Sequence, residues 1–178
     1  MTPTAHQIVT AELPALLPRL WRYGLVLSGD RSRAEDLVQA TCVRALEKHS
    51  QFTVGTRLDR WLFSILRSIW LNEVRALKIR EGQGFVSAEE VLFVDGERRI
   101  ETNILAAEVF REVMALPEAQ RETLLLVYVE GYSYREAAET LHVPVGTIMS
   151  RLAAARGKLS RLDADRQELR DRLAGEDR

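Results

Sequence analysis

The stretch from Gly131 to Leu159 constrains the fold of this chain more than any other, because it predicts two short helices joined by a tight turn. Ser133 precedes the first helix and Glu136 follows three residues later, which is the pattern of a capping box. The run His142-Val143-Pro144 ends this helix, because proline has no amide hydrogen to donate and restricts the residue before it. The second helix has an apolar stripe at helical spacing, formed by Ile148, Leu152, Ala155 and Leu159.

Two helices joined in this way predict a helix-turn-helix, whose second helix lies in the major groove of DNA. From Ser133 to Arg161 the chain has five basic and two acidic residues, which suits a phosphate surface. Spacing alone leaves an ordinary helical hairpin inside a hydrophobic core as the alternative. The outward residues of the second helix are small or polar: Gly146, Ser150, Ala153 and Gly157.

Composition limits the remaining possibilities. The chain has 178 residues, 46% of them hydrophobic, which is enough for one large domain or two small ones. A net charge of −1 argues against a uniformly basic protein that coats DNA. The same net charge is compatible with DNA binding through local basic patches. Cys42 is the only cysteine, so neither an intrachain disulfide nor a cysteine-rich zinc site is expected. The sequence shows no signal-peptide pattern and no apolar run long enough to span a bilayer, so we expect a cytoplasmic protein without membrane insertion.

The N-terminal part predicts three helices. The first covers residues 11–28, the second is capped by Ser32 with Glu35 three residues later, and the third covers 57–80. The third helix carries six basic residues, two acidic residues and aromatic side chains, a combination that suits phosphates and stacked bases. Trp61 falls on its predicted apolar stripe and is expected in the core, whereas Trp70 is open to either role. That stripe is formed by Leu58, Trp61, Leu62, Ile65 and Ile69.

We therefore expect an all-α chain of two small helical domains joined by a flexible linker, the second domain being a helix-turn-helix. The predicted boundaries are 1–80, an acidic linker at 81–101, 102–162, and a charged helical tail at 163–178. In the second domain, helices over 103–116 and 117–131 would support the helix-turn-helix. The second of these is expected to supply core residues Leu124, Leu125, Val127, Tyr128 and Val129.

Catalytic signatures are absent from the sequence. It has no glycine-rich phosphate loop, no G-x-S-x-G and no H-E-x-x-H, and its three histidines are scattered singly. We therefore expect no catalytic residue, no metal site, no cofactor and no small-molecule substrate. An all-helical enzyme would need a convergent polar pocket that the sequence does not predict.

Two separate blocks resemble one protein family. GYSYREAAETLHVPVGTIMSRLAAARGKL is similar to the C-terminal helix-turn-helix of bacterial sigma factors of the extracytoplasmic-function (ECF) group, with the pattern G-x-S-x-x-E-A/I-A, V-P-x-G-T-V-K-S-R and A-R-x-x-L. AEDLVQATCVRALEKHSQF and TRLDRWLFSILRSIWLNEVR resemble their N-terminal domain, with the pattern A-E-D-L-V-Q-E, F-x-x-G-T and W-L-x-x-I-x-x-N. The blocks stand in the family's order. LPALL, RWLFSILRS and LPEAQRETLLLVYVEGYSY resemble the general-stress-response subgroup.

The resemblance implies a protein that binds core RNA polymerase and directs it to promoter DNA, and that an anti-sigma factor regulates. In this family the N-terminal domain docks on the polymerase clamp helices and captures bases of the non-template strand at the −10 element. Positions matching the clamp contact are Asp36, Leu37, Gln39, Thr41 and Arg44. Positions matching the −10 contact are Phe52, Thr56, Arg60, Trp61, Arg67, Ser68, Asn72 and Arg75. Positions matching the contact of the C-terminal domain with the −35 duplex are Pro144, Gly146, Thr147, Met149, Ser150, Arg151, Ala153, Ala154, Arg156 and Lys158.

Four residues in the segments that resemble the family depart from its usual pattern. Ala40 stands where glutamate is frequent, and Ser68 stands where asparagine is usual. Met149 and Ala154 replace cations, and a good bidentate base contact is worth roughly 1–3 kcal/mol. We therefore expect weaker or altered recognition of the upstream element.

Two other functions remain compatible with the sequence. The four departures keep open a sigma-like mimic that titrates an anti-sigma factor without initiating transcription. A helix-turn-helix repressor is the other alternative, and it would bind palindromic half-sites as a dimer.

Overall fold

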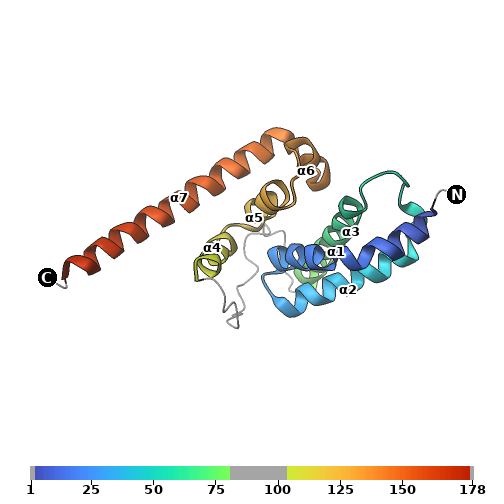
Figure 1. Ribbon diagram of the computed structural model, residues 1–178, viewed down its shortest axis with the longest axis horizontal. Coiled ribbons are helices and arrows are strands. Elements are labelled where there is room, and N and C mark those ends of the chain that lie inside the picture. The colour runs from blue at the N-terminus through green and yellow to red at the C-terminus, as the bar shows by residue number, and fades with distance from the viewer. Residues whose placement is uncertain (1–2, 81–103, 177–178) are drawn as a thin grey trace. The chain divides into compact units, whose positions relative to one another are not determined.

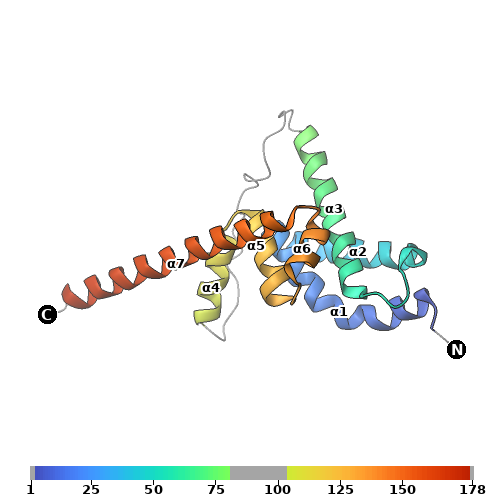
Figure 2. The ribbon, with the colours of Figure 1, turned by 90° about the horizontal axis from the view of Figure 1, so that it is seen from above.

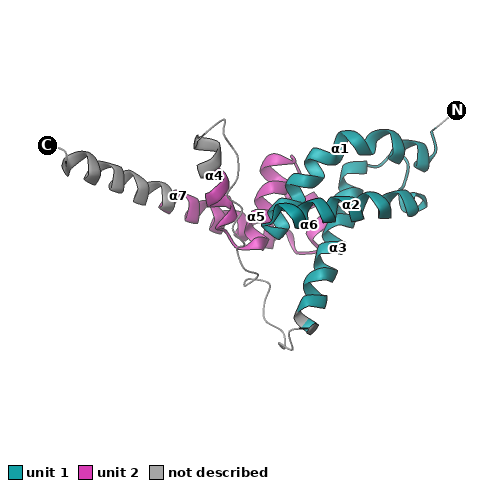
Figure 3. Cartoon of the chain, turned by 90° about the horizontal axis from the view of Figure 1, so that it is seen from below, with its two compact units in different colours: residues 1–97 teal, residues 98–178 magenta. Residues whose placement is uncertain are grey.

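The computed structural model describes residues 3–80 and 104–176 (Figure 1). In this part of the chain every regular element is a helix, so the predicted all-α class is confirmed. The chain divides into two compact units, residues 1–97 and 98–178 (Figure 3). The predicted acidic linker at 81–101 lies outside the described residues. No helix among the described residues is long and apolar enough to cross a membrane.

The first unit is a bundle of three helices, α1 (Ala5–Ser28), α2 (Arg31–Glu47) and α3 (Leu58–Arg80), each of which packs against the other two (Figure 2). A short 3-10 helix, η1 (His49–Gln51), lies in the connection between α2 and α3. α1 and α2 approach closely at Gly24, where an added Cβ would lie 3.2 Å from the Cα of Ala34. The fully buried large side chains of this unit are Leu20, Tyr23, Leu27, Leu37, Leu62, Phe63, Leu66 and Trp70.

α1 is longer than predicted because it begins at a capping box that the sequence prediction missed. The Thr4 amide donates to Oε1 of Gln7 at 2.9 Å, and the Gln7 amide donates to Oγ1 of Thr4 at 3.3 Å. The helix continues through Pro14 and Pro18. It ends at Gly29, whose φ of 71° is left-handed and therefore favours glycine.

The predicted cap of α2 is wrong by two residues. Asp30, rather than Ser32, is the N-cap, and its carboxylate accepts a hydrogen bond from the Arg33 amide at 2.8 Å. Because Gly29 turns the chain at once, α2 begins only two residues after it, which leaves Ser32 inside the first turn.

The predicted apolar stripe of α3 is rotated away from the observed one. Trp70 is only 1% exposed and belongs to the core, whereas Trp61, expected in the core, is half-buried. Ile65 and Ile69 are also half-buried. α3 carries apolar residues on more than one side and packs against both α1 and α2. The helical period alone therefore fits two different apolar stripes, and it does not decide which one is buried. The observed buried side is formed by Leu58, Asp59, Leu62, Phe63, Leu66, Trp70 and Val74.

The second unit contains α4 (Ile104–Met114), α5 (Glu118–Leu124), a π-helix η2 (Leu125–Val129), α6 (Tyr134–Leu141) and α7 (Val145–Glu176). α4, α5 and α6 all pack against α7. The predicted helical tail is confirmed as helix as far as Glu176, since α7 continues to that residue. The core of this unit includes Leu116, Leu126, Leu141, Ile148, Leu152 and Ala155.

The π-helix explains one wrong prediction about this core. Tyr128 and Val129, expected to be buried, are 54% and 52% exposed. The Glu130 amide donates to the carbonyl of Leu125 at 3.0 Å, a hydrogen bond spanning five residues. Residues near such a turn do not keep the 3.6-residue period from which their burial was predicted.

Candidate nucleic-acid interface

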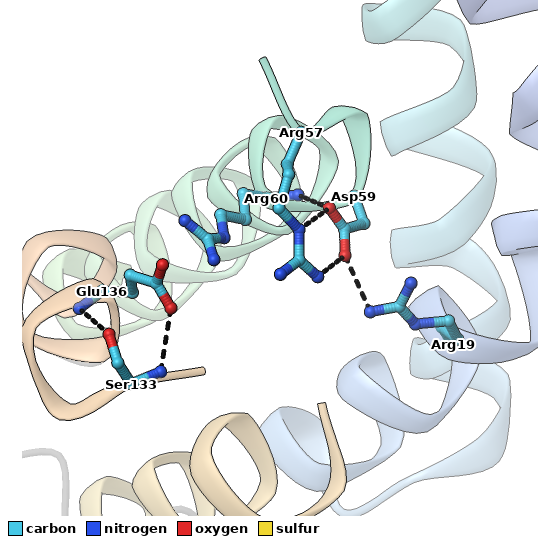
Figure 4. A network of polar contacts seen from close by, with 6 residues as sticks. All are labelled: Arg19, Arg57, Asp59, Arg60, Ser133 and Glu136. Carbon is cyan, nitrogen blue, oxygen red and sulfur yellow. Dashed lines mark hydrogen bonds and ion pairs between the residues drawn. The ribbon is translucent and has the colours of Figure 1, made fainter. Parts of the chain in front are cut away.

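The helix-turn-helix is assembled by α6, a short turn and α7. At the start of α6 the Ser133 amide donates to Oε2 of Glu136 at 2.8 Å, and the Glu136 amide donates to Oγ of Ser133 at 3.3 Å, so the predicted capping box is confirmed (Figure 4). α6 ends at His142, which adopts a left-handed φ of 54°. Pro144 then leads into α7, and its carbonyl accepts from the Thr147 amide at 2.9 Å.

The first four turns of α7 have one buried side and one open side. Ile148, Leu152 and Ala155 are each at most 1% exposed, as the apolar stripe predicts, and Leu159 is half-buried. Two apolar residues in these turns are exposed, Met149 at 55% and Val145 at 40%. Thr147 and Arg151 are half-buried, and the exposed predicted positions are Pro144, Gly146, Met149, Ser150, Ala153, Ala154, Arg156 and Lys158.

The open side of α7 is electrostatically suited to phosphate. From Val145 to Arg161 its sequence contains four cationic residues and no carboxylate. The N-terminal end of a helix also carries a partial positive charge that favours anions. The cations of this segment are Arg151, Arg156, Lys158 and Arg161.

The predicted −10 residues on α3 largely share its open side. Ser68, Asn72 and Arg75 are exposed, and Arg75 donates a hydrogen bond to Oδ1 of Asn72 at 3.3 Å. Arg60, Trp61 and Arg67 are half-buried. These residues therefore present guanidinium, amide, hydroxyl and indole groups along one side of a single helix.

The loop before α3 has buried supports and an exposed tip. Phe52 is only 4% exposed, and its ring lies 5.5 Å from that of Trp61, centroid to centroid. Phe52 therefore supports Trp61 and does not itself offer a ring to a base in this structure. Thr56 is exposed, and its hydroxyl donates to the Thr53 carbonyl at 2.7 Å. Gly55 has a left-handed φ of 91°, which closes this turn.

The residues predicted to contact polymerase separate into an exposed set and a buried pair. Asp36, Gln39 and Arg44 are exposed on α2. Leu37 and Thr41 are 0% exposed, and the Thr41 hydroxyl donates to the Leu37 carbonyl at 2.7 Å. In this structure Leu37 and Thr41 lie in the core of the helical bundle, whereas Asp36, Gln39 and Arg44 face solvent from the same helix.

Two apolar residues of α2 lie on the surface. Val43, which the helical pattern places off the buried side, is 56% exposed, whereas Leu46, which the same pattern places on the buried side, is 42% exposed. Asp36, Gln39 and Val43 recur at spacings of three and four residues, so they share one side of the helix. That spacing is the signal that identifies Val43 from the sequence, because it places an apolar side chain among polar ones.

A groove of about 520 Å³ lies between α2 and α3 and connects the two predicted contact sets of this unit. Arg44 of the polymerase set and Asn72 of the −10 set both line it. Burial raises the pKa of Glu73 in this groove, and the positive charge of Arg33 offsets the rise in part. The other lining residues are Arg33, Ile69, Ala76 and Leu77. Within the described ranges, no three His, Cys, Asp or Glu side chains gather as metal ligands would.

Comparison with known proteins identifies the family. The sigma-70 region 2 family model matches residues 13–79, and the sigma-70 region 4 model matches 107–159. The ECF RNA polymerase sigma factor EcfG of Rhodopseudomonas palustris is 38% identical over 154 residues, which cover 85% of this chain and 82% of that protein. The chain belongs to the ECF RNA polymerase sigma factors. The ECF sigma factor SigC of Mycobacterium tuberculosis is 35% identical over 140 residues, covering 79% of this chain and 75% of that relative.

Solved structures of two related proteins share the fold. Sigma factor RpoE of Bartonella quintana, solved with the anti-sigma factor NepR, matches with a TM-score of 0.71 and 30% identity over 86% of this chain and 94% of that one. CnrH, solved with the cytosolic domain of CnrY, matches with a TM-score of 0.58 and 26% identity over 90% of this chain and 99% of that one. The family resemblance stated from the sequence is therefore confirmed. The general-stress-response subgroup stays a prediction.

Proposed function

We propose that this ECF sigma factor docks on core RNA polymerase through α2 and directs initiation at promoters that it reads at two separate elements, one with each unit. The observation that carries the proposal is the separation of core residues from residues assigned to partners. In both units the buried apolar residues hold the helices together, while most of the residues assigned to partners lie on an open side.

The −35 element would be read by α7. Its N-terminal turns enter the major groove, where Ser150 and Thr147 are close enough to the helix start to reach base edges. Arg151, Arg156 and Lys158 supply phosphate contacts that fix the register. Met149 offers an apolar side chain where a cation is usual in the family, so the affinity for this element is expected to be modest.

The −10 element would be captured by the open side of α3 and the tip of the preceding loop. Half-buried Trp61 offers part of an aromatic face to an unstacked base, with Phe52 supporting it from behind. Arg67 and Arg75 attract the strand through its phosphates. Ser68 has a shorter hydrogen-bonding group than asparagine, which reduces base selectivity at that position.

Polymerase would dock on the side of α2 that presents Asp36, Gln39 and Val43. An exposed apolar side chain flanked by polar ones is the usual composition of a protein interface, with an apolar centre and a polar rim. Leu37 and Thr41 would act indirectly, by fixing the position of α2 in the bundle.

Regulation by an anti-sigma factor is part of the proposal, since the sigma factor RpoE was solved with the anti-sigma factor NepR. An inhibitor that covers Val43 and its polar neighbours would prevent docking on polymerase. We place the protein in the cytoplasm, where polymerase acts, and retain the general-stress-response subgroup as a proposal.

Run-off transcription with purified core polymerase on genomic promoter fragments tests this function. Transcripts that depend on this protein are expected, and their start sites would give both promoter elements. Absence of transcripts with stable binding to an anti-sigma factor would support the mimic instead. Binding of a dimer to a palindromic site without polymerase would support the repressor.

A further inference from the structure

A buried carboxylate joins three parts of the first unit. Asp59 lies in the first turn of α3, and its side chain is 9% exposed. Its Oδ2 accepts from a terminal nitrogen of Arg19 on α1 at 2.8 Å. Arg57 donates to the same carboxylate twice, from Nε to Oδ1 at 3.1 Å and from a terminal nitrogen to Oδ2 at 2.6 Å (Figure 4). The Arg60 amide also donates to Oδ1, at 2.9 Å.

The carboxylate stays ionised despite its burial. Burial raises the pKa of Asp59, but hydrogen bonds and charge attraction from Arg57 and Arg19 outweigh it and hold the pKa below the usual carboxyl range. The Arg19 guanidinium also lies 5.6 Å from the centre of the Phe63 ring, which fixes its direction. A forked arginine–carboxylate pair has a defined geometry, so Arg57 is held in one orientation.

Arg57 is the last residue of the loop that carries the exposed tip at residues 53–56. The beginning of that loop is held independently. His49 lies with its ring centre 5.0 Å from that of His6 on α1, and Phe52 is buried against Trp61. The loop therefore has two anchored ends and an exposed tip between them.

We infer that Asp59 is a positioning residue for capture of the −10 strand: through Arg57 and Arg19 it fixes the loop tip and the start of α3 before DNA arrives. Being buried, Asp59 does not need to touch DNA itself. A loop ordered in advance avoids the entropy cost of being ordered on binding. The inference rests on the proposed function, because it assumes that this loop and α3 receive the −10 strand.

The test is binding of single-stranded −10 oligonucleotides, with and without single-base changes, to holoenzyme assembled from core polymerase and the full chain. Asp59→Asn keeps the size of the side chain and removes its charge. We expect affinity for the strand to fall on the order of tenfold and the preference among bases to flatten, because several loop side chains must then be ordered on binding. Affinity for core polymerase is expected to remain within about twofold, since α2 is untouched. Asp59→Glu is expected to restore part of the preference.

Asp30→Ala is the matched control. It removes another helix-terminal aspartate of the same unit, at the end of α2 remote from the loop, and so lowers stability without releasing Arg57. Equal flattening by Asp30→Ala and Asp59→Asn would overturn the inference, as would an unchanged base preference in Asp59→Asn.

Arg19→Met provides an independent arm if Asp59→Asn does not fold. It removes one of the two arginines and leaves Arg57 on the carboxylate, so a smaller loss in the same direction is expected. An unchanged base preference in Arg19→Met would then overturn the inference. A wild-type holoenzyme with no preference for the −10 strand would instead refute the proposed function, so the two failures are distinguishable.

Discussion

Replacing Met149 by lysine should strengthen binding to upstream promoter DNA and make it more sensitive to salt. Met149 is 55% exposed on the open side of α7, so a lysine there needs no repacking of the core. No carboxylate occurs between Val145 and Arg161 to bind the new ammonium group. The added cation is therefore available to a phosphate or to a guanine edge in the groove.

The magnitude follows from counterion release. Each phosphate neutralised on duplex DNA adds about 0.9 to the slope of log affinity against log salt. A rise from 50 to 200 mM salt is a fourfold change, so one added contact should cost the variant about 3.5-fold more affinity than the wild type over that range. At the lower salt concentration the variant should bind more tightly than the wild type.

The assay is fluorescence anisotropy of holoenzyme with a labelled duplex that carries the −35 element, measured across that salt range. Val129→Lys is a matched control, because Val129 is 52% exposed in the same unit but lies on the π-helix rather than on α7. A slope that does not change in Met149→Lys, or that steepens equally in both variants, would refute the placement of Met149 at the DNA.

Three further outcomes are expected. Ser133→Ala should lower the free energy of unfolding of the second unit by about 1 kcal/mol in denaturant titrations, through loss of the capping box. Trp70→Ala should cost about 3–5 kcal/mol in the same titrations, whereas Trp61→Ala should cost less and chiefly weaken binding to the −10 strand. The folded-state pKa of Asp59 is lowered, so its contribution to stability is present at neutral pH and is lost only as pH falls below about 4. Asp59→Asn should therefore reduce the acid sensitivity of thermal unfolding, and an unchanged pH profile would contradict this.

The sequence was most informative where a local rule determines the structure. The capping box at Ser133, the end of the first helix at Ser28 and three of the four residues in the apolar stripe of α7 each depend on residues close in the chain, and all three predictions are confirmed. The order of two family blocks gave the family itself. These features need no knowledge of which helix packs against which.

Predictions failed where a distant partner decides between alternatives. α3 has apolar residues on several sides, and its buried side includes Asp59, whose carboxylate pairs with Arg19 of another helix and with Arg57 of the preceding loop. A charged residue in a buried stripe misleads a periodicity argument, which is why Trp61 was expected in the core and Trp70 was left open to either role. Tyr128 and Val129 were misplaced because a π-helix is not visible in the hydrophobic pattern.

The central claim is that one molecule uses its two units on two promoter elements at once. Photo-crosslinking from a benzophenone side chain placed at Met149 or, separately, at Thr56 tests it in the transcription-competent complex. Crosslinks from position 149 are expected only in the −35 duplex, and crosslinks from position 56 only in the non-template strand of the −10 element. Crosslinks from both positions to the same element, or none from either in a complex that makes transcripts, would contradict the account.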